Sequence, residues 1–80
     1  MSLPAAEIDA RGLLCPLPVL RLRKRLLALP EGAEARLLAT DAAAALDVPH
    51  FCAEAGHAYL GAEDLADGAR AYRVRRGPER

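Results

Sequence analysis

The chain has 80 residues, of which 52% are hydrophobic and only 4% aromatic. A chain of this length forms one domain with a thin aliphatic core, so we expect residues 1–80 to fold as a single unit that is ordered from about residue 6 to about residue 76, with short frayed termini. Eleven basic and eleven acidic residues cancel, which argues against a protein that binds nucleic acid over its whole surface.

The first half of the chain predicts a strand, a helix and a second strand. Residues 6–10 indicate the first strand, which ends at Arg11-Gly12. A helix begins at Pro16 or Pro18, because proline is favoured at the first helical position. Pro30-Glu31-Gly32 ends that helix, and alternation over residues 34–40 predicts the second strand, with Leu38 suggesting that both sheet faces are partly covered. The apolar helix face repeats at three- and four-residue steps through Val19, Leu22, Leu26 and Leu29.

The second half predicts one more helix and two more strands. Residues 41–46 are ambiguous, since their four consecutive alanines favour a helix. We place the main helix at residues 48–55, with Asp47 as its cap and Gly56 as its stop. Strands follow at residues 57–62 and 69–75, with a polar turn at 63–68 and a frayed tail at 77–80. The predicted fold is α+β: a two-layer α/β sandwich of βαβαββ order, with two helices on one face of a four-stranded mixed sheet.

Cys15 stands at or just before the expected start of the first helix. Backbone N–H groups and the helix dipole favour a negative charge there, so a thiolate or a persulfide would be stabilised. The prolines that follow lack an N–H group, and the stabilisation must come from the N–H groups of Leu17, Val19 and Leu20. We therefore expect a moderately lowered pKa for the Cys15 thiol.

The sequence has no second cysteine three residues after Cys15, which excludes the local disulfide of a thioredoxin-type site. A lone exposed thiol can accept the outer sulfur of a persulfide and later give it up. Two other readings stay open: Cys15 as a small apolar residue packed at a helix start, and a redox sensor that links Cys15 to Cys52.

We expect structural roles for the remaining candidate residues. Cys52 beside Phe51 is read as a core-facing packing residue, and Asp9 and Asp41, at strand ends, as caps of turns or helices rather than catalytic acids. The irregular spacing of His50, Cys52 and His57 argues against a metal site. His57 is expected to interact with the last carbonyls of the preceding helix.

Basic residues follow Cys15 closely. The usual explanation is a solvated helix face. The alternative is a local surface for an acidic partner, formed with arginines from other parts of the chain. The residues of this surface are Arg11, Arg21, Arg23, Lys24, Arg25, Arg73, Arg75 and Arg76.

The chain lacks both a run of about 20 apolar residues that would cross a bilayer and an N-terminal signal peptide. We expect a cytoplasmic protein without membrane contact, whose thiols stay reduced.

The segment Asp9-Ala-Arg-Gly-Leu-Leu-Cys-Pro-Leu-Pro-Val-Leu-Arg-Leu-Arg-Lys resembles the signature of the TusA family, also called SirA-like. The resemblance continues nearly to the end of the chain, through Glu31-Gly32, Ala39-Thr40-Asp41, Asp47-Val48-Pro49-His50-Phe51-Cys52, Gly56-His57 and Tyr72-Arg73-Val74-Arg75-Arg76-Gly77.

The resemblance implies a two-layer α/β sandwich that carries persulfide sulfur on the cysteine of a Cys-Pro-x-Pro motif, here Cys15, with Gly12, Leu13, Pro16 and Pro18 as supporting motif residues. It implies a donor such as a cysteine desulfurase or a rhodanese-like protein, and a downstream acceptor protein. It also implies no cofactor other than the covalent sulfur. The balanced charge argues against stable nucleic-acid binding, and we expect a monomer, because one cysteine must meet two partners in turn. Among the pathways that such carriers serve, we expect 2-thiolation of tRNA uridine, with sulfur oxidation, thiosulfate use and molybdenum-cofactor pathways as alternatives.

Leu17, between the two prolines, is a departure, because tRNA-thiolating relatives often have a polar or acidic residue there. With Leu13 and Leu14 it predicts an apolar docking rim, and the candidate docking residues are Arg11, Leu17, Arg21, Arg23 and Lys24. A function of another class, a regulatory module that binds RNA or protein and in which Cys15 is structural, is the competing hypothesis.

Overall fold

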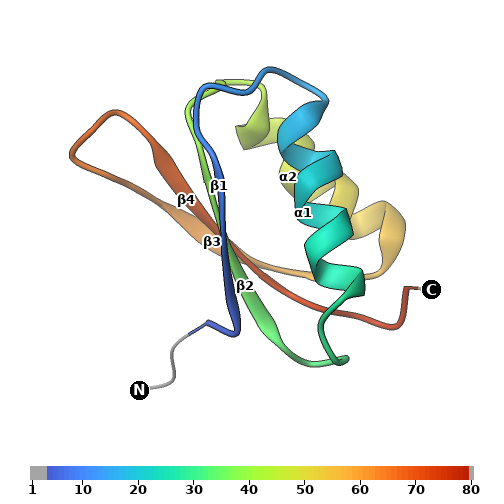
Figure 1. The fold of residues 1–80 in the computed structure, drawn as a ribbon. Coiled ribbons are helices and arrows are strands. Elements are labelled where there is room, and N and C mark those ends of the chain that lie inside the picture. Colours follow the sequence, from blue (N-terminus) through green and yellow to red (C-terminus); the bar gives the residue numbers. More distant parts are fainter. Residues whose placement is uncertain (1–3, 80) are drawn as a thin grey trace.

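A computed structural model describes residues 4–79 of the chain. The elements, in chain order, are β1 (Ala6–Ala10), α1 (Leu17–Leu27), β2 (Glu34–Ala39), α2 (Ala44–Ala55), β3 (Ala58–Asp64) and β4 (Arg70–Arg75). Both helices lie on one face of the sheet (Figure 1). The predicted βαβαββ order and the two-layer α+β class are confirmed.

The four strands form one mixed sheet in the order β1-β2-β4-β3. β1 and β2 are parallel, as expected for strands joined through a helix, and β4 lies antiparallel between β2 and β3. β3 reaches Asp64, so the polar turn predicted over residues 63–68 begins later than expected. Its register shifts between Tyr59 and Gly61, where the strand pairs with β4.

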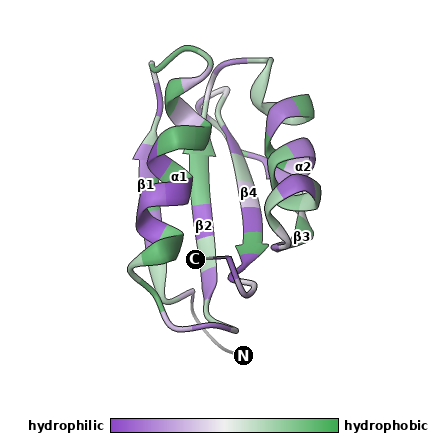
Figure 2. Ribbon diagram, turned by 90° about the vertical axis from the view of Figure 1, so that its right-hand side faces the viewer, coloured by the Kyte–Doolittle hydropathy of each residue, from purple (hydrophilic) through white to green (hydrophobic). Residues whose placement is uncertain are grey.

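The core lies between the helices and the sheet. Ile8 on β1 and Leu37 on β2 meet Leu22 and Leu26 of α1. Hydrophobic and hydrophilic residues alternate along α1, as burial of one face requires (Figure 2). On the opposite face of the sheet Leu38 is also buried, which confirms the expectation that this face is partly covered.

α2 begins at Ala44, four residues before the predicted start at Val48. Asp41 explains the earlier start: its carbonyl accepts the N–H of Ala44 at 3.1 Å and its carboxylate accepts the N–H of Ala43 at 3.2 Å. The alanines then continue the helix, and no side chain caps it. The predicted cap at Asp47 is therefore wrong, whereas the predicted stop at Gly56 is confirmed by a left-handed φ of 85°.

The C-terminal segment does not fray at Gly77–Glu79 as predicted. The ring of His57 is buried, its Nδ1 accepts the N–H of Gly77 at 2.8 Å, and its Nε2 lies 2.8 Å from the Glu79 carboxylate. Glu79 also pairs with Arg23 on α1 at 3.0 Å. His57 therefore holds the C-terminal segment against the body of the protein. It interacts with the last helix carbonyls, as predicted, but through its backbone N–H, which donates to the Cys52 carbonyl at 2.9 Å, and not through its ring. Residues 1–3 and 80, which the predicted frayed ends include, lie outside the described residues.

Candidate functional site

Cys15 lies on the loop between β1 and α1 and is exposed. The loop is fixed at its start, where Gly12 has a φ of 81° and donates its N–H to Thr40 Oγ1 at 2.9 Å. Leu13 packs against the core, and Pro18, the second residue of α1, is buried. Three of the predicted supporting residues thus hold the loop, and the fourth, Pro16, is the residue from which α1 starts.

The backbone of Cys15 is anchored by a carboxylate. Its N–H donates to Oδ2 of Asp41 at 2.7 Å. Because Oδ1 of the same carboxylate accepts the Ala43 N–H, Asp41 ties the Cys15 loop to the start of α2. The expectation that Asp41 caps a turn is confirmed by its bond to the Ala43 N–H, and the structure adds a contact with the Cys15 backbone that the sequence did not predict.

The N–H groups at the start of α1 are largely engaged. Leu17 donates its N–H to the Leu14 carbonyl at 2.9 Å, and Leu20 donates to the Pro16 carbonyl at 3.1 Å. Of the three donors expected to stabilise an anionic sulfur, these two are already bonded within the chain. The helix start therefore gives the sulfur less stabilisation than the sequence predicts.

The pKa of the Cys15 thiol is raised above its ordinary value of 9.0, which overturns the expected lowering. The largest cause is a hydrogen bond with the Asp47 carboxylate. Partial desolvation and the negative charges of Asp47 and Asp41 act in the same direction, because all of them disfavour a thiolate. The surroundings of Cys15 thus favour the protonated thiol.

A groove lies beside Cys15, between the start of α1 and the exposed side of α2, and has a volume of about 360 Å³. Asp47, Phe51 and Glu54 follow one another at helical spacing on α2 and line it. The sequence contains this spacing, but a helix predicted to start at Val48 leaves Asp47 outside it, at the cap position. The other residues of the groove are Pro16, Val19 and His50.

Of the predicted rim of Leu13, Leu14 and Leu17, the last two are 70% and 50% exposed, whereas Leu13 packs against the core. Leu20, which is 54% exposed, joins Leu14 and Leu17 in the apolar rim that the structure shows. A second groove brings two of the docking candidates, Arg21 and Lys24, together with the rim. Its lining residues are Leu13, Leu17, Leu20, Arg21 and Lys24.

Two docking candidates lie elsewhere. Arg11 pairs with Asp9 and with Asp67, each at 2.9 Å, and Arg23 pairs with Glu79. The pairing with Arg11 lowers the pKa of Asp9 to about 2.

Further arginines of the basic surface predicted from the sequence are also bonded within the chain. Arg73 pairs with Glu34, and Arg76 donates to the Leu26 carbonyl. The basic surface near Cys15 is therefore limited to Arg21 and to two exposed residues in the last turn of α1, Lys24 and Arg25.

Cys52 is 1% exposed and belongs to the core, so its predicted packing role is confirmed. Burial raises the pKa of its thiol to about 11, which disfavours thiol exchange there. His50 is exposed and lies 3.8 Å from Glu54, whereas His57 is buried against the C-terminal segment. His50, Cys52 and His57 thus lie in three separate surroundings.

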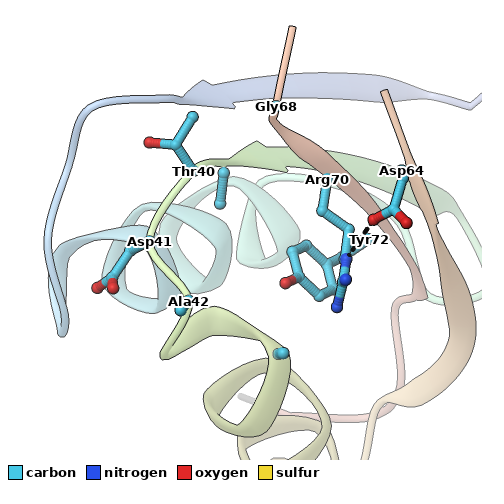
Figure 3. A pocket seen from close by; sticks show the side chains of 9 residues that line it. Thr40, Asp41, Ala42, Asp64, Gly68, Arg70 and Tyr72 are labelled. Atoms are coloured by element: carbon cyan, nitrogen blue, oxygen red, sulfur yellow. Dashed lines mark hydrogen bonds and ion pairs between the residues drawn. The ribbon is translucent and has the colours of Figure 1, made fainter. Parts of the chain in front are cut away.

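A pocket of about 370 Å³ lies next to Asp41, between the ends of β2 and β4 and the start of α2 (Figure 3). Arg70 binds Asp64 in it at 2.8 Å, and Tyr72 lies beside them. The Asp41 carboxylate points away from Arg70 and Tyr72. This orientation suits its bond to the Cys15 backbone.

Comparisons with known proteins show what this chain is similar to. Residues 6–76 match the family model described as sulfurtransferase TusA. The sulfur carrier protein TusA of Pseudomonas syringae pv. syringae is 41% identical over 71 residues, which cover 89% of this chain and 83% of that protein. A putative sulfur carrier protein of Neisseria meningitidis serogroup A is 42% identical over 57 residues, covering 71% of this chain and 77% of that one.

The crystal structure of a SirA-like protein from Desulfitobacterium hafniense has the same fold. It superimposes with a TM-score of 0.80 at 25% sequence identity, and the match covers 90% of this chain and 97% of that one. The described part of this chain, residues 4–79, holds no helix that is long and apolar enough to cross a membrane.

Proposed function

Because the chain belongs to the TusA family of sulfur carriers, we propose that it carries sulfur as a persulfide on Cys15, which it accepts from a donor protein and passes to an acceptor protein. The observation that carries this proposal is the exposed, free Cys15 on a loop that both a backbone turn and a carboxylate hold in place. The other cysteine, Cys52, is enclosed in the core. One accessible thiol is sufficient for transfer and unsuited to internal disulfide cycling.

The transfer itself is a displacement on sulfur. The Cys15 sulfur attacks the outer sulfur of the donor persulfide, the donor S–S bond breaks, and the donor cysteine leaves as a thiolate. In the second half the acceptor thiol attacks the outer sulfur on Cys15 in the same manner. Electrons balance within each exchange, so the carrier needs no cofactor and acts as a sulfurtransferase only together with its partners.

We assign the donor to the class of cysteine desulfurases or rhodanese-like proteins and the final use to 2-thiolation of tRNA uridine. The same relay in sulfur oxidation, thiosulfate or molybdenum-cofactor metabolism is the alternative. A monomer in the cytoplasm suits this role, because a reducing compartment keeps Cys15 free and one thiol must meet two partners in turn.

We place the docking surface on the apolar rim and the basic residues beside it. Leu14, Leu17 and Leu20 offer an apolar contact that closes over the transferred sulfur, and Arg21 and Lys24 orient an acidic partner. Leu17→Glu places a carboxylate in the rim and should change the rate of loading, of delivery or of both. Equal rates for this variant and the wild type would remove Leu17 from the docking surface.

The test is covalent. After incubation with a cysteine desulfurase and cysteine, the intact mass of the wild type should rise by one sulfur atom and return on treatment with a thiol reductant. Cys15→Ser should gain nothing, whereas the matched control Cys52→Ala should load as the wild type does. If the wild type gains no sulfur from a desulfurase or from a rhodanese-like donor, the carrier function is refuted. Salt-sensitive RNA binding that Cys15→Ser leaves intact would then favour a regulatory module.

A further inference from the structure

The groove beside Cys15 has an uneven distribution of charge. On the α1 side Pro16 and Val19 are apolar, and Phe51 adds an apolar ring from α2. The titratable groups that line it besides Cys15 all belong to α2: Asp47, His50 and Glu54. Asp41 adds a carboxylate behind the Cys15 backbone, and no lysine or arginine is among the lining residues.

Asp47 and Cys15 line the same groove, so the Asp47 carboxylate lies beside the thiol. Asp47 is half-buried in the first turns of α2, and its proximity is the largest influence on the ionisation of Cys15. A carboxylate that accepts the thiol proton stabilises the protonated form, and its charge repels a thiolate. Since the thiolate is the attacking species, Asp47 slows Cys15 while the carrier is free.

Loading therefore requires the proton to leave Cys15 against the field of Asp47. We propose that Asp47 gates the carrier: it retains the proton on Cys15 in the free protein, and a lysine or arginine side chain of the docked partner neutralises Asp47 and frees the sulfur to attack. This inference rests on the proposed persulfide relay. The proton passes to the donor cysteine, which leaves as a thiolate when its S–S bond breaks, so the exchange balances without an oxidant.

The charge of the groove defines the partner. A protein that presents a cation next to its reactive cysteine is attracted by Asp47 and Glu54, and its apolar residues cover Val19 and Phe51. Small anionic sulfur compounds such as thiosulfate are repelled by the same carboxylates. The carrier thus takes its sulfur from a protein persulfide and is slow to react with free anionic donors or with stray oxidants.

The test compares the wild type with Asp47→Asn. Alkylation of Cys15 by the neutral reagent iodoacetamide is followed against pH, with peptide mass spectrometry to separate Cys15 from Cys52. The rate at neutral pH should rise severalfold in Asp47→Asn, and the midpoint of the profile should move to lower pH. Glu31→Gln, which removes an exposed carboxylate outside the groove, should retain the wild-type profile.

Two further measurements separate gating from a merely structural role. The preference of Cys15 for iodoacetamide over anionic iodoacetate should narrow in Asp47→Asn. Loading from a desulfurase should show a higher KM and a similar kcat, because the cation of the partner loses its counter-charge while the docked thiol is already free. Because unfolding would also speed alkylation and weaken loading, the alkylation of the buried Cys52 must stay as slow in Asp47→Asn as in the wild type, which shows that the variant is folded. Asp47→Ser serves as the second variant in case the asparagine protein does not fold.

An unchanged midpoint in folded Asp47→Asn and Asp47→Ser would overturn the gate, even if the wild type loads normally. A shifted midpoint in a protein that never acquires sulfur would instead refute the carrier function and leave the coupling of Asp47 and Cys15 in place. A desulfurase that loads Asp47→Asn with the wild-type KM would overturn the partner cation.

Discussion

Replacing Asp41 by alanine should slow the loading of Cys15, because Asp41 is the acceptor that fixes the backbone of the reactive residue. One carboxylate oxygen binds the Cys15 N–H at 2.7 Å and the other binds the Ala43 N–H at 3.2 Å. Hydrogen bonds to charged groups contribute about 1.5–3 kcal/mol when shielded from water. Both bonds lie near the surface, so we assign about 1 kcal/mol to each and expect the free energy of unfolding to fall by about 2 kcal/mol.

The effect on loading follows from the Cys15 bond alone. If its share of about 1 kcal/mol holds the sulfur in position for attack, loading at low carrier concentration should slow about fivefold. The assay is the rate of sulfur gain by intact mass with a cysteine desulfurase, and circular dichroism during chemical unfolding measures the change in stability. Both values are obtained on the same preparation.

The matched variant Asp41→Asn separates position from charge. Its single amide oxygen can still accept the Cys15 N–H, while the bond to the Ala43 N–H and the negative charge that raises the pKa of Cys15 are both lost. We expect Asp41→Asn to load at least as fast as the wild type, and Asp41→Ala to load more slowly than both. Equal loading by the alanine and asparagine variants would refute the argument that the Asp41 bond positions the sulfur.

Two predictions concern the C-terminal segment. Gly77→Ala should be strongly destabilising, because its Cβ would overlap the Gly56 carbonyl, and a melting temperature equal to that of the wild type would contradict this close approach. The hydrogen bond with His57 lowers the pKa of Glu79 below its ordinary value of 4.5, so the ionised carboxylate stabilises the fold above that pH and this contribution is lost as the pH falls through the lowered value. Between about pH 5 and about pH 3 the wild type should therefore lose more stability than Glu79→Gln, as measured by urea unfolding at each pH; parallel losses in the two proteins would show that Glu79 is not responsible.

Local signals in the sequence accounted for most of the elements. The turn-prone pair Arg11-Gly12 marked the end of β1, the periodic leucines with the flanking prolines predicted α1, and Gly56 marked the end of α2. The sequence predicts a helix that starts at Val48 with Asp47 as its cap. In the structure, Asp41, six residues before Asp47, makes the turn that begins α2. The fraying predicted for the C-terminal segment was also wrong, because the hydrogen-bond partner of Gly77 is His57, which lies 20 residues away in the chain.

In the candidate site, too, local features were predicted from the sequence and contacts between distant residues were not. Cys15, the motif around it and the apolar Leu14 and Leu17 beside it were recognisable from the sequence, whereas the exposure of Leu20 was not predicted. The ionisation of Cys15 was predicted in the wrong direction. Helix-start reasoning considers only the local backbone, whereas the carboxylate that dominates comes from the other helix.

By itself, the sequence determined the order of the elements, the two layers and the identity of the reactive thiol, since these depend on periodicity, proline and glycine positions and a contiguous motif. Only the tertiary structure decided what surrounds that thiol. Packing α1 beside α2 brings Asp41 to the backbone of Cys15 and Asp47 to its sulfur, across separations of 26 and 32 residues in the chain. The pKa of a thiol depends on charges within a few ångströms, and those charges are set by the packing of the two helices and not by the residues adjacent to Cys15.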